Sequence, residues 1–144
     1  VQLSGIQPED KVLELGHGPG LGMQLAAKLL TEPTGRLIGV DYSAYMHQVM
    51  SDLKELLATA MPLADSTVDR VFHCNCYYFS PDIRKGATEI HRVMKPGGLM
   101  VTSLRLTHVA AFAAKQVMPS ENWRPDSGFT DVRMEDNMSV FCTD

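Results

Sequence analysis

The sequence predicts an α/β protein with a doubly wound, mostly parallel sheet that closes with a C-terminal antiparallel strand pair. Two observations carry this prediction. Short apolar segments alternate with amphipathic segments along the whole chain, which is typical of βαβ units. A glycine-rich turn follows the first apolar segment, where such a chain passes from strand to helix. The 144 residues, 44% hydrophobic and 21% charged, have the size and composition of one globular domain.

Local patterns predict each element in order. Short apolar runs predict strands at four places: residues 11–15, 36–40, 67–74 and 99–104. Apolar residues at helical spacing predict helices at four others: residues 21–30, 44–57, 83–93 and 109–117. Segments with glycine and proline end two of these helices, at residues 31–35 and 95–98. The closing antiparallel pair is predicted at residues 132–136 and 139–143. In the first helix the apolar residues at helical spacing are Leu21, Leu25, Leu29, Ala26 and Leu30.

Charge and hydropathy argue against several classes of protein. Thirteen Lys and Arg against 17 Asp and Glu give a net charge of −4. Without a basic run, the chain lacks the usual means of gripping nucleic acid independently of sequence. No apolar run reaches the roughly 18 residues of a membrane-spanning helix, and the first residues do not resemble a secretory leader. We therefore expect an intracellular, cytoplasmic protein; its oligomeric state is not predicted.

The cysteines predict neither a disulfide framework nor a metal site. Cys74 and Cys76 are two residues apart on a predicted strand, so their side chains point to opposite faces and cannot readily share one ion. We expect small buried thiols and no bound metal. The neighbouring His73, Tyr77 and Tyr78 have no partner identifiable in the sequence. We interpret them as packing residues or substrate walls and assign no catalytic residue.

A glycine-rich loop and an acid after the second strand predict a nucleoside-containing cofactor. Gly16, Gly18 and Gly20 allow a ligand to lie directly against the backbone. Asp41 ends the next strand, 21 residues after Gly20, where a carboxylate can accept both hydroxyls of a ribose. A tight turn and a helix-capping acid would explain each feature alone, but their combination favours the nucleoside site. The dinucleotide pattern G-x-G-x-x-G fails in both registers, because its third glycine falls on a leucine or a methionine.

Four motifs, in order, resemble those of the class I S-adenosylmethionine-dependent methyltransferases. Residues 14–20 (E-L-G-H-G-P-G) match the family's E/D-x-G-x-G-x-G, and residues 39–46 (G-V-D-Y-S-A-Y-M) match its G-x-D-x-S-x-x-M. Residues 61–71 and 89–98 are similar to its L-P-F-x-D-x-S-F-D-x-V and E-x-x-R-V-L-K-P-G-G. The resemblance is nearest to the branch that methylates quinones and other small molecules. It implies a Rossmann-like fold, S-adenosylmethionine as cofactor with S-adenosylhomocysteine as product, and a small-molecule methyl acceptor.

The resemblance also implies ten cofactor-binding residues: Glu14, Gly16, His17, Gly18, Gly20, Asp41, Tyr42, Met46, Asn75 and Cys76. The glycines would hold the methionine part of the cofactor, with His17 contributing mainly through its backbone. Glu14 would orient the loop and reach the cofactor's amino group directly or through water. Asp41 would bind the ribose hydroxyls. Two further acids, Asp65 and Asp69, are interpreted as a turn acid and a strand-entry acid.

The remaining residues of this set concern the adenine and the methyl group. Tyr42 and Met46 would line the adenine, although Met46 serves equally well as a helix-core residue. Asn75 and Cys76 would lie beside the sulfonium and its methyl group. A general base is required only if the methyl acceptor must lose a proton, and none is assigned.

The sequence departs from the family pattern by being short in three places. No third strand, and no acid for the adenine amino group, is present just before residue 61. Two explanations remain open: a true short form, or a single domain over residues 1–144 that lacks mobile segments near 58–61, 125–126 and 137–139. We favour the second. The alternative functions are a degenerate methyltransferase-like domain that binds a partner without catalysis, and a nicotinamide oxidoreductase, against which the glycine spacing argues.

Overall fold

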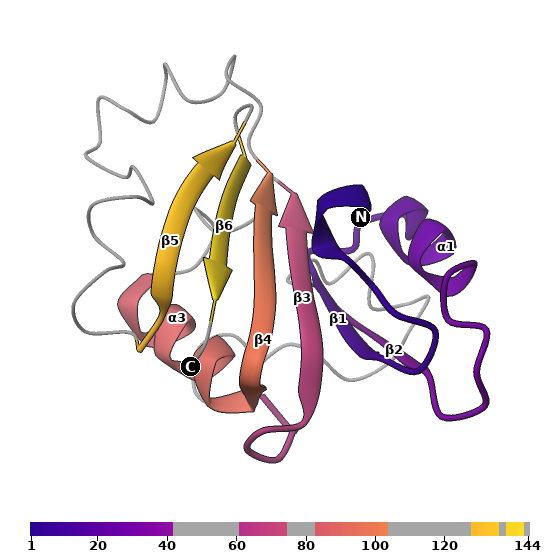
Figure 1. The fold of residues 1–144 in the computed structure, drawn as a ribbon, viewed down its shortest axis with the longest axis horizontal. Coiled ribbons are helices and arrows are strands. Elements are labelled where there is room, and N and C mark those ends of the chain that lie inside the picture. The colour runs from indigo at the N-terminus through magenta and orange to yellow at the C-terminus, as the bar shows by residue number, and fades with distance from the viewer. Residues whose placement is uncertain (42–60, 75–82, 104–127, 136–137, 143–144) are drawn as a thin grey trace.

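The computed structural model describes residues 1–41, 61–74, 83–103, 128–135 and 138–142 (Figure 1). The helices predicted at residues 44–57 and 109–117 lie outside the described residues. The elements, in order, are η1 (Gln2–Ser4), β1 (Lys11–Leu15), α1 (Leu21–Ala27), β2 (Arg36–Val40), β3 (Val68–Cys74), α3 (Ile83–Val93), β4 (Met94–Ser103), β5 (Thr130–Glu135) and β6 (Met138–Cys142).

The described strands form one six-stranded sheet in the order β2-β1-β3-β4-β6-β5. Neighbours among β2, β1, β3 and β4 pair in parallel, which confirms the predicted parallel sheet with helical connections. β6 pairs antiparallel with both β4 and β5, and Figure 1 shows it running opposite to both neighbours. Because the four parallel strands point the same way, their carboxyl ends meet at one edge of the sheet, where a ligand site is expected.

Two apolar cores cover the two faces of the sheet, and alternation along β1 divides its side chains between them. Leu13 and Leu15 belong to the core beneath α3, which buries Ala87, Ile90 and Val93 of that helix. Val12 belongs to the smaller core on the other face, with Ala26 of α1, Phe72 of β3 and Val101 of β4. Glu14, two residues after Val12, is therefore on the side of the sheet covered by η1 and α1.

The first helix differs from its prediction in its length and its buried face. α1 ends at Ala27 rather than near residue 30. Of the five apolar residues at helical spacing, three do not pack against the sheet: Leu21, Leu25 and Leu29 are exposed, at 66%, 55% and 41%. The small Ala26 is the residue of α1 that is buried against the sheet, with Leu30 partly buried after it. Helical spacing predicted the helix but not which of two possible faces packs.

β4 begins five residues earlier than the sequence predicts. Val68 pairs with Met94 and Arg70 pairs with Leu99, so one residue of β3 is matched against four residues of β4. These four, residues 95–98, were predicted only to stop the preceding helix. They form an irregularity within the ladder, where Gly97 has a φ of +75° that favours glycine.

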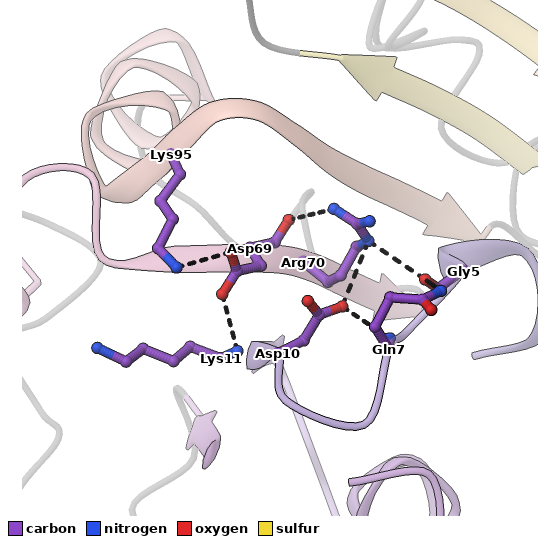
Figure 2. Close-up of polar contacts among 7 residues, drawn as sticks. All are labelled: Gly5, Gln7, Asp10, Lys11, Asp69, Arg70 and Lys95. Atoms are coloured by element: carbon purple, nitrogen blue, oxygen red, sulfur yellow. Dashed lines mark hydrogen bonds and ion pairs between the residues drawn. The ribbon is translucent and has the colours of Figure 1, made fainter. Parts of the chain in front are cut away.

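The strands begin with a network of paired charges, shown in Figure 2. Lys95 Nζ is 2.7 Å from Asp69 Oδ1, and the backbone N–H of Lys11 donates to Asp69 Oδ2 at 2.9 Å. Arg70 reaches Asp10 at 3.6 Å and the carbonyl of Gly5, which holds the N-terminal segment against β3. These contacts confirm Asp69 as a structural strand-entry acid.

A second polar cluster, the Arg92 clamp, fixes the loop before β3 to α3. Arg92 pairs with Glu89 and with Asp65, and donates to the carbonyl of Met61. Glu89 Oε1 accepts the backbone N–H of Met61 at 2.6 Å, and the Met61 side chain is buried in the core beneath α3. Asp65 is thus a turn acid, as predicted. The clamp thus connects two of the four motifs, residues 61–71 and 89–98.

No helix in the described part of the chain is long and apolar enough to cross a membrane.

Candidate functional site

A cavity of about 440 Å³ opens at the carboxyl ends of β1, β3 and β4. Its lining residues come from the end of β1, the loop after it, the start of α1, the ends of β3 and β4, and the residue before η1: Val1, Glu14, Gly16, His17, Gly18, Pro19, Leu21, Gly22, Phe72, His73, Cys74, Val101 and Ser103. Four predicted cofactor residues are among them. We call this the carboxyl-edge cavity. It lies where an open α/β sheet is expected to bind its ligand.

The loop over residues 16–20 has a backbone that requires glycine. Gly16, Gly18 and Gly20 have φ values of +66°, +50° and +81°, a region that other residues rarely adopt. The N–H of Gly16 donates to the carbonyl of Val40 at 2.6 Å, which ties the loop to the end of β2. A Cβ atom on Gly18 or Gly20 would meet nothing within 4 Å. The backbone at these two glycines therefore faces open space that a ligand can approach.

Glu14 presents a buried carboxyl group to the carboxyl-edge cavity. The residue is 6% exposed, and its Oε2 has no hydrogen-bond partner among the described residues. The backbone N–H of Met23 donates to the carboxyl group, and Gly22 leaves room for it, since a Cβ there would overlap Glu14. Burial is the main reason that the pKa of Glu14 rises from 4.5 to about 7, with a smaller contribution from the negative charge of Asp41.

The side chains of Asp41 and His17 both contact the backbone of Gly18 in the glycine loop. Asp41 is 8% exposed, and its Oδ2 accepts the backbone N–H of Gly18 at 2.6 Å. The ring of His17 is also buried, with Nδ1 2.9 Å from the carbonyl oxygen of Gly18. The acid predicted for the ribose and the loop predicted for the methionine part of the cofactor are therefore in direct contact. Gly20 begins α1 as its N-cap residue.

The far wall of the cavity contains residues that the sequence did not assign to the site. Phe72 and Val101 form its apolar part, and Cys74 and Ser103 lie above them on neighbouring strands, with Sγ and Oγ 3.8 Å apart. The expectation of a buried thiol is wrong for Cys74, which is exposed because it ends β3 at the edge of the sheet. Position at a strand end was the available signal for Cys74 and Ser103. Phe72 and Val101 required knowledge of the strand register.

His73 has a structural environment, as predicted. Its side chain is 2% exposed, and Nε2 lies 2.8 Å from Oγ1 of Thr102, its register partner on β4. Burial lowers the pKa of His73 from 6.5 to about 4, so the ring is neutral at physiological pH.

Part of the predicted site lies outside the described residues, namely Tyr42, Met46, Asn75 and Cys76. Within the described ranges, no group of three or more His, Cys, Asp or Glu side chains could hold a metal ion.

Comparison with known proteins identifies the family. Residues 13–102 match the family model described as a methyltransferase domain. An uncharacterized methyltransferase of Bacillus subtilis, YdaC, is 34% identical over 142 residues, covering 91% of this chain and 77% of that protein. The malonyl-[acyl-carrier protein] O-methyltransferase of Methylococcus capsulatus is 29% identical over 165 residues, covering 92% of this chain and 58% of that enzyme. The chain thus spans little more than half the length of that curated relative.

The fold agrees with solved structures. A Haloferax volcanii methyltransferase chain, solved in complex with the Trm112 methyltransferase activator, superposes with a TM-score of 0.69 at 18% identity, covering 97% of this chain and 85% of that one. The Rossmann-like sheet and its edge cavity define a class I methyltransferase fold. This chain belongs to the S-adenosylmethionine-dependent methyltransferase family.

The residues present fit the family's cofactor. The open backbone of Gly18 and Gly20 leaves space beside the loop, and Oε2 of Glu14, which no other described residue hydrogen-bonds, offers an acceptor to a cationic group. Asp41, at the end of β2, places a second carboxylate next to the same loop.

Proposed function

We propose that this chain transfers the methyl group of S-adenosylmethionine to a small-molecule acceptor. The observation that carries the proposal is the arrangement of the glycine loop, the buried Glu14 carboxyl and Asp41 around one edge of the sheet. Two kinds of polar group that such a cofactor needs, an acceptor for its ammonium and an acceptor for its ribose, come from neighbouring strands. The relatives named as methyltransferases support the same activity.

The cofactor brings the reactive sulfonium methyl, so the chain's own task is binding, alignment and exclusion of water. In this proposal Gly16, Gly18 and Gly20 hold the methionine part through the loop backbone. Glu14 faces the ammonium group and Asp41 accepts the ribose hydroxyls. The methyl acceptor would approach from the opposite wall of the cavity, which contains Cys74 and Ser103.

The remaining sequence predictions extend this proposal. Tyr42 and Met46 would line the adenine, and Asn75 and Cys76 would lie beside the methyl group. The malonyl-[acyl-carrier protein] activity of the Methylococcus relative suggests an acyl carboxylate as the first acceptor to test. We also retain the expectations of a cytoplasmic protein without a nucleic-acid partner.

For the domain, we retain the interpretation that segments are absent near residues 58–61, 125–126 and 137–139. The match to the Methylococcus enzyme extends over 165 residues, whereas 92% of this 144-residue chain is only about 132 residues. That relative therefore carries additional residues inside the matched region, as both missing segments and a true short form would require.

The test is calorimetric titration with S-adenosylhomocysteine. We expect wild type to bind, Asp41→Ala to lose binding, and the matched control Asp65→Ala to retain it, because Asp65 belongs to the Arg92 clamp. Transfer of labelled methyl from S-adenosylmethionine to malonyl-[acyl-carrier protein] would then test the acceptor. Failure of wild type to bind S-adenosylhomocysteine would contradict the proposal and favour the alternative of a non-catalytic binding domain.

A further inference from the structure

We propose that Glu14 couples cofactor binding to a proton: it is a neutral carboxylic acid in the free protein and ionises when the cofactor's ammonium group binds beside it. This inference rests on the proposed function and deepens it, because it assigns a chemical state to a residue of that site. It follows from where the carboxyl group lies and from the charges around it.

Among the described residues, the Glu14 carboxyl group has few hydrogen-bond partners. Its side chain is 6% exposed in the wall of the carboxyl-edge cavity, and Oε2 has no hydrogen-bond partner among the described residues. The carboxyl group packs against Gly22 and receives the N–H of Met23. An ionised carboxylate held this way would be desolvated and only partly hydrogen-bonded, which is costly.

The charges facing Glu14 do not compensate for that burial. Asp41, from the end of β2, adds a negative charge that raises the pKa of Glu14. Among the described residues, the other titratable groups of the cavity wall are His17 in the glycine loop, Cys74 of β3, and His73 of β3, which is neutral. Within the described residues, no Lys or Arg side chain lines the cavity. Burial has the largest effect, so the pKa of Glu14 rises to about 7.

Binding of a cationic ligand favours the ionised form of Glu14 over the neutral form. The ammonium group keeps its own protons and donates hydrogen bonds to the carboxylate, while the proton lost by the carboxylic acid passes to the solvent. One proton is therefore released for each ligand bound, in proportion to the fraction of Glu14 that was protonated beforehand. Affinity should rise with pH by up to about tenfold per pH unit below pH 7 and level off above it.

The experiment is titration of the full chain with S-adenosylhomocysteine in pairs of buffers that differ in ionisation enthalpy, between pH 6 and 8. The buffer dependence of the heat counts the protons released. We expect most of one proton at pH 6, about half a proton at pH 7, and little at pH 8. Glu14→Gln should bind without releasing protons and with an affinity that does not change over this range.

Two controls need no assumption about how Glu14→Gln folds. With wild type, 5′-methylthioadenosine, which lacks the ammonium and carboxylate groups, should bind without proton release. His17→Gln should keep the proton release of wild type even if its affinity falls, because Glu14 is unchanged.

The possible failures are distinguishable. Binding of S-adenosylhomocysteine to wild type without proton release would overturn the inference and leave the proposed function intact. Proton release that persists in Glu14→Gln but disappears in His17→Gln would overturn it in favour of the histidine. Absence of any binding to wild type would overturn the proposed function, and this inference with it.

Discussion

At the two ends of the parallel strands, the pKa values of carboxyl groups are shifted in opposite directions. At the amino ends, Asp69 receives the Lys95 ammonium and the N–H of Lys11, and these hydrogen bonds lower its pKa although partial burial opposes them. At the carboxyl ends, burial raises the pKa of Glu14, whose Oε2 has no partner in the described part of the chain. β1 carries Glu14 and β3, its neighbour, carries Asp69.

The paired Asp69 carboxylate stabilises the fold, whereas the Glu14 carboxyl group is placed to bind a cationic ligand. A paired carboxylate favours the folded protein when it is ionised, whereas an unpartnered buried one disfavours it. Removal of a charge should therefore have opposite consequences at the two ends of the sheet.

Glu14→Gln should stabilise the free protein at high pH. Because the folded pKa of Glu14, about 7, exceeds the ordinary 4.5, its contribution to stability is complete below pH 4.5 and is lost as the pH rises through 7. The whole difference amounts to about 3 kcal/mol. Relative to wild type, the variant should gain stability between pH 4.5 and 8, as measured by urea unfolding without ligand.

The matched control is Glu89→Gln in the Arg92 clamp. The hydrogen bond from Arg92 lowers the pKa of Glu89, so its stabilising contribution is present above the ordinary pKa and is lost as the pH falls. Its replacement should destabilise the protein at pH 7. Similar behaviour of the two variants would remove the distinction between the two ends.

His73→Gln should remove an opposing pH dependence of similar size. The folded pKa of His73, about 4, is below the ordinary 6.5, so stability is lost as the pH falls from 6.5 to 4, by about 3 kcal/mol in all. Glutamine is polar, as histidine is, but does not titrate. Between pH 4.5 and 6.5 the contributions of His73 and Glu14 should nearly cancel in wild type, and each single variant should reveal the other. An unchanged slope in His73→Gln would contradict the burial argument.

Sequence alone predicted the parallel framework well because that framework depends on local patterns. The strands at 11–15 and 36–40 and the helix at 83–93 have the predicted bounds, since short apolar runs and one amphipathic period specify them. It also predicted the glycine loop and Asp41, which come together at Gly18. These features are encoded within a few residues of each other or at a known spacing from the loop.

What the sequence did not predict depends on contacts between distant segments. The exposure of Leu21 and Leu25 follows from which side of α1 meets the sheet, and the early start of β4 follows from its pairing with β3. The opposite cavity wall at Phe72 and Val101 requires the register of two strands. The raised pKa of Glu14 could not be predicted either, because it depends on the burial of the carboxyl group and on which hydrogen-bond donors lie near it.

Arg92→Ala should have the next largest effect, now at the structural end. The substitution removes the hydrogen bonds of Arg92 to Glu89, Asp65 and the carbonyl of Met61, which hold the loop before β3. With the side chain 31% exposed, we expect a loss of about 2 kcal/mol in unfolding free energy. The control is Arg36→Ala, which loses only exposed hydrogen bonds to Pro33 and Gly35 and should cost less than about 0.5 kcal/mol. Equal effects of the two variants would mean that the clamp does not stabilise the fold.

The smallest effect should come from Lys95→Met, which removes one partner of a half-exposed ion pair. Asp69 keeps the N–H of Lys11, so its carboxylate is not left without a hydrogen bond. The exposed fractions of the two side chains, 39% and 23%, allow water and salt to screen the pair, which should contribute about 0.5 kcal/mol. Urea unfolding at low and at 1 M salt should show the difference from wild type disappearing at the higher concentration. Affinity for S-adenosylhomocysteine should remain that of wild type, since the pair lies at the end of β3 away from the cavity. A loss of affinity in this variant would show that the two ends of the sheet are energetically coupled.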